Sequence, residues 1–60
     1  MQILIRPWIG DKVLIDDEIK AVVTAVHIYS ETRVTVSVDY FHNSHNVSVV
    51  VEQWRLAHSP

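Results

Sequence analysis

The segment that most constrains the fold is Arg33–Phe41, in which valines alternate with mostly polar residues. One face of this segment carries Val34, Val36, Val38 and Tyr40. A repeat of two residues is that of a β-strand with one buried face, and β-branched side chains favour strands over helices. We therefore expect Arg33–Phe41 to be the middle strand of an antiparallel sheet, with Phe41 on the face opposite the valines.

Further short apolar runs lie on both sides of this strand, separated by polar connections such as the loop His42–Asn46. In the run that follows this loop, Val47, Val49 and Val51 alternate in the same way and share one face. The expected elements are strands at Lys12–Ile15, Ile19–Tyr29, Arg33–Phe41, Asn46–Glu52 and Leu56–His58, with a helical turn at Gln53–Arg55. Ile19–Tyr29 is apolar on both faces, and an amphipathic helix is the competing assignment. Its many β-branched residues favour a long, bent strand that serves two sides of a barrel.

Four to five short antiparallel strands without a long helix predict an all-β fold. The connection lengths favour a small SH3-like barrel with a short helical turn before the last strand. A barrel also protects the valine-rich edges that an open sheet would expose. We expect residues 1–60 to form this single domain.

The first eight residues, Met1–Trp8, predict an N-terminal arm or edge strand, because Pro7 has no backbone N–H to donate to a ladder. Its apolar residues are candidates for contact with a second subunit: Ile3, Leu4, Ile5 and Trp8. An arm that covers the end of its own barrel is the alternative. Both readings follow from the small size of the chain, which has to supply enough apolar burial alone or share a core in a homo-oligomer.

The charge and composition narrow the functional classes. Five Lys and Arg against seven Asp and Glu give a net charge of −2, which disfavours nucleic-acid binding by phosphate contacts. The chain has no Cys and no apolar run long enough to span a bilayer. We therefore expect a cytoplasmic protein without disulfides and without a membrane partner.

Two side-chain combinations near the end of the middle strand resemble chemical sites. Asp39, His42 and His45 are possible metal ligands, but His-x-x-His in a loop supplies only two firm ones. Asp39, Ser44 and His45 have the residue types of a nucleophilic triad, which also needs a cleft that a 60-residue barrel hardly provides. We therefore expect no enzyme activity, no metal and no cofactor.

The better candidate is a protein-binding surface. Its candidate residues are Asp39, Phe41, His42, His45, Trp54 and Arg55. Aromatic residues and Arg are enriched among the residues that dominate binding energy at interfaces. The alternative is that Trp54 caps one end of the barrel and Phe41 covers the other.

Four stretches of the chain also carry a resemblance. They are Gly10-Asp11-x-Val13, Val23–Val26, Val38–Asn43 and Val51–Leu56. In order and spacing they resemble small SH3-like barrel proteins of phages and prophages that have no assigned role. The likeness covers about Gly10 to Leu56 and implies the barrel fold and a phage origin, with no chemistry to transfer.

The leading functional hypothesis is a non-enzymatic interaction module, encoded by a phage, that binds or inhibits a host protein such as a defence factor. One alternative is a nucleic-acid-binding barrel. It would use Lys12, Lys20, Arg33 and Arg55. The other alternative is a structural phage component that self-assembles through Ile3, Leu4 and Ile5.

Overall fold

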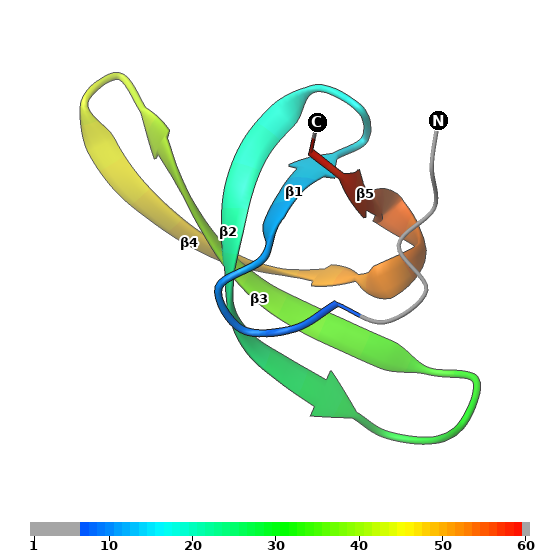
Figure 1. Ribbon diagram of the computed structural model, residues 1–60. Coiled ribbons are helices and arrows are strands. Elements are labelled where there is room, and N and C mark those ends of the chain that lie inside the picture. The colour runs from blue at the N-terminus through cyan, green and yellow to red at the C-terminus, as the bar shows by residue number, and fades with distance from the viewer. Residues whose placement is uncertain (1–6, 60) are drawn as a thin grey trace.

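The computed structural model describes residues 7–59 and shows one antiparallel sheet of five strands (Figure 1). The elements are β1 (Lys12–Ile15), β2 (Ile19–Ile28), β3 (Val34–His42), β4 (His45–Glu52), the 3-10 helix η1 (Gln53–Arg55) and β5 (Leu56–His58). The predicted all-β class and the helical turn before the last strand are therefore confirmed. The apolar residues Ile3, Leu4 and Ile5 lie outside the described residues.

The strands follow the order β4-β3-β2-β1-β5 across the sheet. Within residues 7–59, β4 pairs only with β3 and β5 pairs only with β1, so the sheet is open and has two edges. This differs from the closed barrel expected from the sequence. Figure 1 shows the β1–β2 and β3–β4 hairpins twisting away from each other, so that their tips point in different directions.

One face of the sheet carries the core. Its buried cluster consists of Val13, Ile15, Ala21, Val23, Val36, Val38, Val51 and Leu56. Partly buried side chains packed against it are Val26, Val34, Tyr40 and Val49. The valine positions predicted to face inward on β3 and β4 are therefore those that face the core. Burial of these side chains is the main source of stability in a domain of this size.

A β-bulge explains the bend expected in β2. The register with β3 shifts between Val23 and Ala25, which leaves Thr24 as the extra residue. Before the bulge the buried side chain is Val23, and after it Val26 packs against the same core. Because a bulge reverses which positions face inward, β2 uses both of its apolar faces without being a helix.

Left-handed residues make the turns short. The β3–β4 connection consists of Asn43 and Ser44, with φ values of 50° and 65°. Positive φ at both central residues is the pattern of a type I′ turn, whose twist matches that of a hairpin. The strands thus extend to His42 and His45, and the connection is shorter than the His42–Asn46 loop that the polar residues suggested.

Candidate functional site

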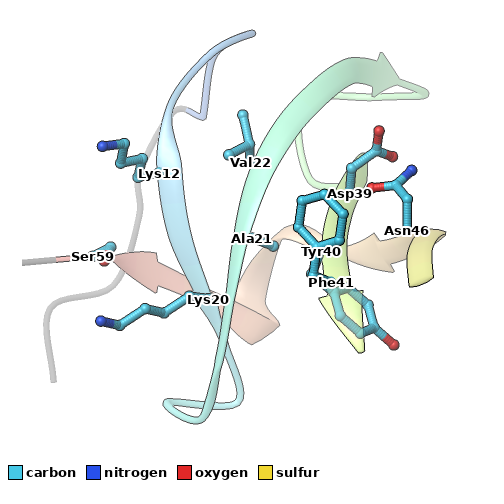
Figure 2. Close-up of a pocket in the computed structure, with 9 residues that line it drawn as sticks. All are labelled: Lys12, Lys20, Ala21, Val22, Asp39, Tyr40, Phe41, Asn46 and Ser59. Carbon is cyan, nitrogen blue, oxygen red and sulfur yellow. The ribbon is translucent and has the colours of Figure 1, made fainter. Parts of the chain in front are cut away.

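A groove opens where β2 and β3 separate. Their ladder ends at the pair Val22–Asp39, whereas β2 begins at Ile19 and β3 continues to His42. Between the separated strand ends lies a hollow of about 250 Å³, shown in Figure 2. Its lining residues are Lys12, Lys20, Ala21, Val22, Asp39, Tyr40, Phe41, Asn46 and Ser59.

Phe41 is the principal apolar side chain of this groove. It has the same parity on β3 as Asp39, so it points away from the core, and its exposed fraction is 79%. Val22 on β2 is also exposed, at 41%. Tyr40 points to the other face and packs against the core, which fixes the backbone that carries Phe41. The groove therefore presents apolar surface that nothing else in residues 7–59 covers.

Two lysines line the same groove. Lys12 is the cross-strand partner of Val22, and Lys20 is the partner of Leu14, so both project from the outer face of the β1–β2 hairpin. Within residues 7–59 the ion pairs join other residues, and both lysine ammonium groups are unpaired. Figure 2 shows them on one side of the groove, with the Asp39 carboxylate and the Asn46 amide on the other.

Asp39 is oriented by its cross-strand neighbour. The Ser48 hydroxyl donates a hydrogen bond of 2.6 Å to the Asp39 carboxylate, and the two residues are paired in the β3–β4 ladder. A short hydrogen bond of this kind to a carboxylate is among the stronger ones in proteins. The carboxylate is therefore held at the β4 side of the groove.

The predicted combination of Asp39 with two histidines is divided between the faces of the sheet. His42 and His45 are partners at the end of the β3–β4 ladder and lie on the face opposite Asp39. Within residues 7–59 no three His, Cys, Asp or Glu residues are grouped so as to hold a metal ion. Alternation along β3 and β4 separates the side chains that seemed adjacent in the sequence. The same alternation separates Asp39 from His45, two members of the possible nucleophilic triad.

The predicted surface of Phe41, Trp54 and Arg55 is likewise divided. Phe41 pairs with Asn46 near one end of β4, whereas Trp54 follows the other end in η1. At about 3.4 Å per residue, Asn46 and Glu52 are about 20 Å apart along the strand. Trp54 is 73% exposed, so it does not cap the core, and it lies at the opposite end of β4 from Phe41.

Arg55 binds within the protein instead of being free for a partner. Its Nε and a terminal nitrogen donate to the two carboxylate oxygens of Asp16, at 3.1 and 2.6 Å. These hydrogen bonds first, and the charge of Arg55 second, lower the pKa of Asp16 below its ordinary value. The same contacts raise the pKa of Arg55. This ion pair links the β1–β2 turn to η1.

Trp8 lies at a second, separate hollow of about 540 Å³. Its lining includes Pro7, Trp8, Val26, Ile28 and Gln53. The Trp8 backbone N–H donates to an Asp11 carboxylate oxygen at 2.9 Å, and Gly10 adopts a φ of 93° in this turn. The Trp8 side chain is 64% exposed. This hollow is at the far end of the β2–β3 hairpin from the groove of Phe41.

The sequence analysis did not predict that Lys12, Lys20 and Val22 line the same groove as Phe41. A signal for the lysines was present, because each immediately precedes a core residue, Val13 or Ala21, and alternation places the preceding side chain on the outer face. No local signal brings β1 near the end of β3, since that depends on how the two hairpins twist.

No helix in residues 7–59 is long and apolar enough to cross a membrane. Comparisons of the chain find no matching protein family, no matching curated protein and no matching solved structure.

Proposed function

We propose that this chain is a non-enzymatic protein-interaction module that binds its partner in the groove between the β1–β2 and β3–β4 hairpins. The observation that carries the proposal is the exposed Phe41 side chain, 79% accessible, in a groove that also holds two lysines without an ion-pair partner in residues 7–59. An exposed aromatic residue beside apolar surface is a typical anchor of an interface.

The charges of the groove favour one chemical class of partner. Lys12 and Lys20 outnumber the single carboxylate of the groove, that of Asp39, and attract carboxylates of a partner. Val22 and Phe41 favour an apolar side chain. The groove of about 250 Å³ is too small for a drug-sized ligand and suits one or two side chains of a protein. We therefore propose a protein segment with an apolar residue flanked by Asp or Glu. In keeping with the resemblance to phage proteins, we propose a host protein, such as a defence factor, as its source.

A comparison of two exposed aromatic residues tests this proposal. Wild-type, Phe41→Ala and Trp54→Ala proteins are used as baits in host lysate, and captured proteins are then titrated against each variant in purified form. We expect Phe41→Ala to weaken binding by about tenfold or more, as the loss of an interface anchor does. Trp54→Ala, which removes an equally exposed ring about 20 Å away along β4, should bind as the wild type does.

The lysines supply a second arm of this experiment. Lys12→Gln with Lys20→Gln should weaken binding and reduce its dependence on salt, because the attraction of carboxylates is screened by ions. Loss of binding with Trp54→Ala and not with Phe41→Ala would place the partner at η1 and contradict the proposal.

The same groove makes single-stranded nucleic acid a second candidate. Lys12 and Lys20 line the same groove as Phe41, and a base that stacks on an aromatic ring with its phosphate near a lysine is a common mode of single-strand binding. The other two cations of that hypothesis are engaged in ion pairs, Arg33 with Glu52 and Arg55 with Asp16. Fluorescence anisotropy with labelled oligonucleotides at low salt distinguishes the two partner classes. Binding that Phe41→Ala abolishes would favour nucleic acid.

We further propose that the sheet is the curled sheet of an SH3-like barrel. Leu56 of β5 and Val51 of β4, on the two edge strands, belong to the same buried cluster. The order of the strands and the 3-10 turn between β4 and β5 fit this architecture. Nuclear Overhauser contacts between the Leu56 and Val51 methyl groups would support it, and their absence would oppose it.

A further inference from the structure

The edge formed by β4 lacks the usual protection of exposed edge strands. β4 is eight residues long, contains no Pro or Lys, and its ladder with β3 runs from Thr35–Glu52 to His42–His45 without a bulge. Natural proteins protect such edges with short strands, lysines, prolines or bulges. β5, at the other edge, has only three residues. Within the described part of the chain, β4 is therefore the strand best suited to pair with another strand.

The hairpin turn determines which backbone groups of β4 point to this open edge. Because the turn consists of Asn43 and Ser44 alone, His42 and His45 form a hydrogen-bonded pair, and such pairs recur at every second position. Val47, Val49 and Val51 therefore share backbone hydrogen bonds with β3. The residues whose N–H and C=O groups point outward are Asn46, Ser48, Val50 and Glu52.

We propose that β4 binds β4 of a second copy of this chain, antiparallel, about a twofold axis at Val49. Of the residues that line the groove, this interface uses only Asn46, and it does not depend on the function proposed above. In this register Ser48 pairs with Val50 of the partner subunit, and Asn46 pairs with Glu52 of the partner subunit. It is the register in which all four outward-pointing residues are paired. A shift by two residues in either direction would place one end of the strand opposite the hairpin turn or η1.

In this register the side chains of one β4 are complementary to those of the partner subunit's β4. Glu52 meets an amide and not a second carboxylate. Val49 meets Val49 of the partner subunit, at the close spacing of a non-hydrogen-bonded pair. On the same face Val47 meets Val51 of the partner subunit. Val47 and Val49 are only half-buried in the single chain, and the second strand would cover them. Because a twofold contact uses the one free edge of each β4, it closes as a dimer and does not extend into a fibre.

A single cysteine tests the register, since the chain contains none. Two residues at a twofold axis in a non-hydrogen-bonded pair have Cα atoms about 4.5 Å apart, within the range of a disulfide. Val49→Cys should therefore form a covalent dimer on mild oxidation. In the matched control Val47→Cys, the two cysteines lie about 14 Å apart along the strands at about 3.4 Å per residue, and cross-linking should be much slower. Equal rates for the two variants would overturn the proposal.

A second pair of variants tests the edge hydrogen bonds. Val50→Pro removes an outward N–H and leaves the donors to β3 intact, whereas Val50→Thr keeps that N–H and the β-branched shape. Sedimentation velocity over a range of concentrations should show dimers for the wild type and Val50→Thr, and monomers for Val50→Pro. Circular dichroism verifies that each variant is folded, and a misfolded Val50→Pro is replaced by Ser48→Pro. A wild type that is monomeric throughout, or a Pro variant that still dimerises, would overturn the proposal.

Discussion

The environment of Thr35 differs from that expected from its position in the sequence pattern. Thr35 lies on the outer, polar face of β3, yet its exposed fraction is only 5% and its hydroxyl has no hydrogen-bond partner within residues 7–59. Its cross-strand neighbours are His27 and Glu52, and the Arg33 side chain reaches Glu52 at 3.3 Å. These larger side chains flank the short threonine. A hydroxyl buried in this way costs free energy because its hydrogen bonds to water are lost.

Thr35→Val is therefore expected to stabilise the protein. Valine has nearly the shape of threonine and no hydroxyl to satisfy, so the free energy of unfolding should rise by about 1 kcal/mol. Thr35→Ser, which keeps the hydroxyl and loses a methyl group, should lower it by about 1 kcal/mol. Urea denaturation monitored by Trp fluorescence measures both. A Thr35→Val protein less stable than the wild type would show that the hydroxyl has a partner in solution.

At the level of the secondary-structure elements, the two hairpin turns use positive φ without glycine. Asp16 and Asp17 in the β1–β2 turn have φ values of 53° and 59°, close to those of Asn43 and Ser44 in the β3–β4 turn. Asn and Asp tolerate the left-handed region because their side chains bond locally, whereas serine does so less readily. The least favourable position is therefore Ser44, with a φ of 65°.

Ser44→Gly should stabilise the β3–β4 hairpin. Asn-Gly is the preferred pair for a type I′ turn, and relief of the left-handed strain should exceed the entropy that glycine loses on folding. We expect a gain of about 0.5–1 kcal/mol, or about 2–8 °C in Tm for a domain of this size. Ser44→Ala is the control, because it removes the hydroxyl and keeps the Cβ atom. Equal thermal stability of the Gly and Ala variants in calorimetry would refute the explanation by backbone strain.

For the whole molecule, one ion pair connects parts of the chain that are far apart in sequence. Asp16 and Arg55 are separated by 39 positions, and the Asp16 backbone N–H also donates to the Arg55 carbonyl at 2.9 Å. They hold η1, and with it the start of β5, against the β1–β2 turn. Both side chains are partly exposed, at 52% and 37%, so the contact depends on solution conditions.

This ion pair predicts a pH dependence of stability. Since Arg55 lowers the pKa of Asp16 in the folded state, the pair contributes stability at pH values above the unfolded-state pKa near 3.8. That contribution is lost as the pH falls through the lower, folded-state pKa. Asp16→Asn should thus be less stable than the wild type at neutral pH, and the difference should disappear between about pH 5 and pH 2.

The matched control for this prediction is Asp17→Asn. Asp17 is the neighbouring carboxylate, it shares the left-handed backbone, and it forms no ion pair with Arg55. Urea denaturation midpoints across the pH series should show the convergence with the wild type for Asp16→Asn only. A constant difference between Asp16→Asn and the wild type at every pH would rule out the ion pair as its cause.

The sequence by itself determined the class and the elements of this protein. Alternating valines predicted β3 and β4 and which of their faces is buried, and the β-branched residues of Ile19–Tyr29 correctly favoured a strand over a helix. These features are readable because they depend on neighbours within a few residues, where the period of the side chains is fixed by backbone geometry. The helical turn of Gln53–Arg55 could be predicted for the same reason, because it too depends on residues close in the sequence.

Only the tertiary structure decided how these elements meet. The twist of the two hairpins opens the groove that both Lys20 and Phe41 line, and alternation across a paired ladder separates Asp39 from His42. The bulge at Thr24 depends on the register between β2 and β3, and the sheet is open because β4 and β5 do not pair in residues 7–59. Twist, register and closure arise from contacts between distant strands, and a periodic pattern within one strand does not contain them.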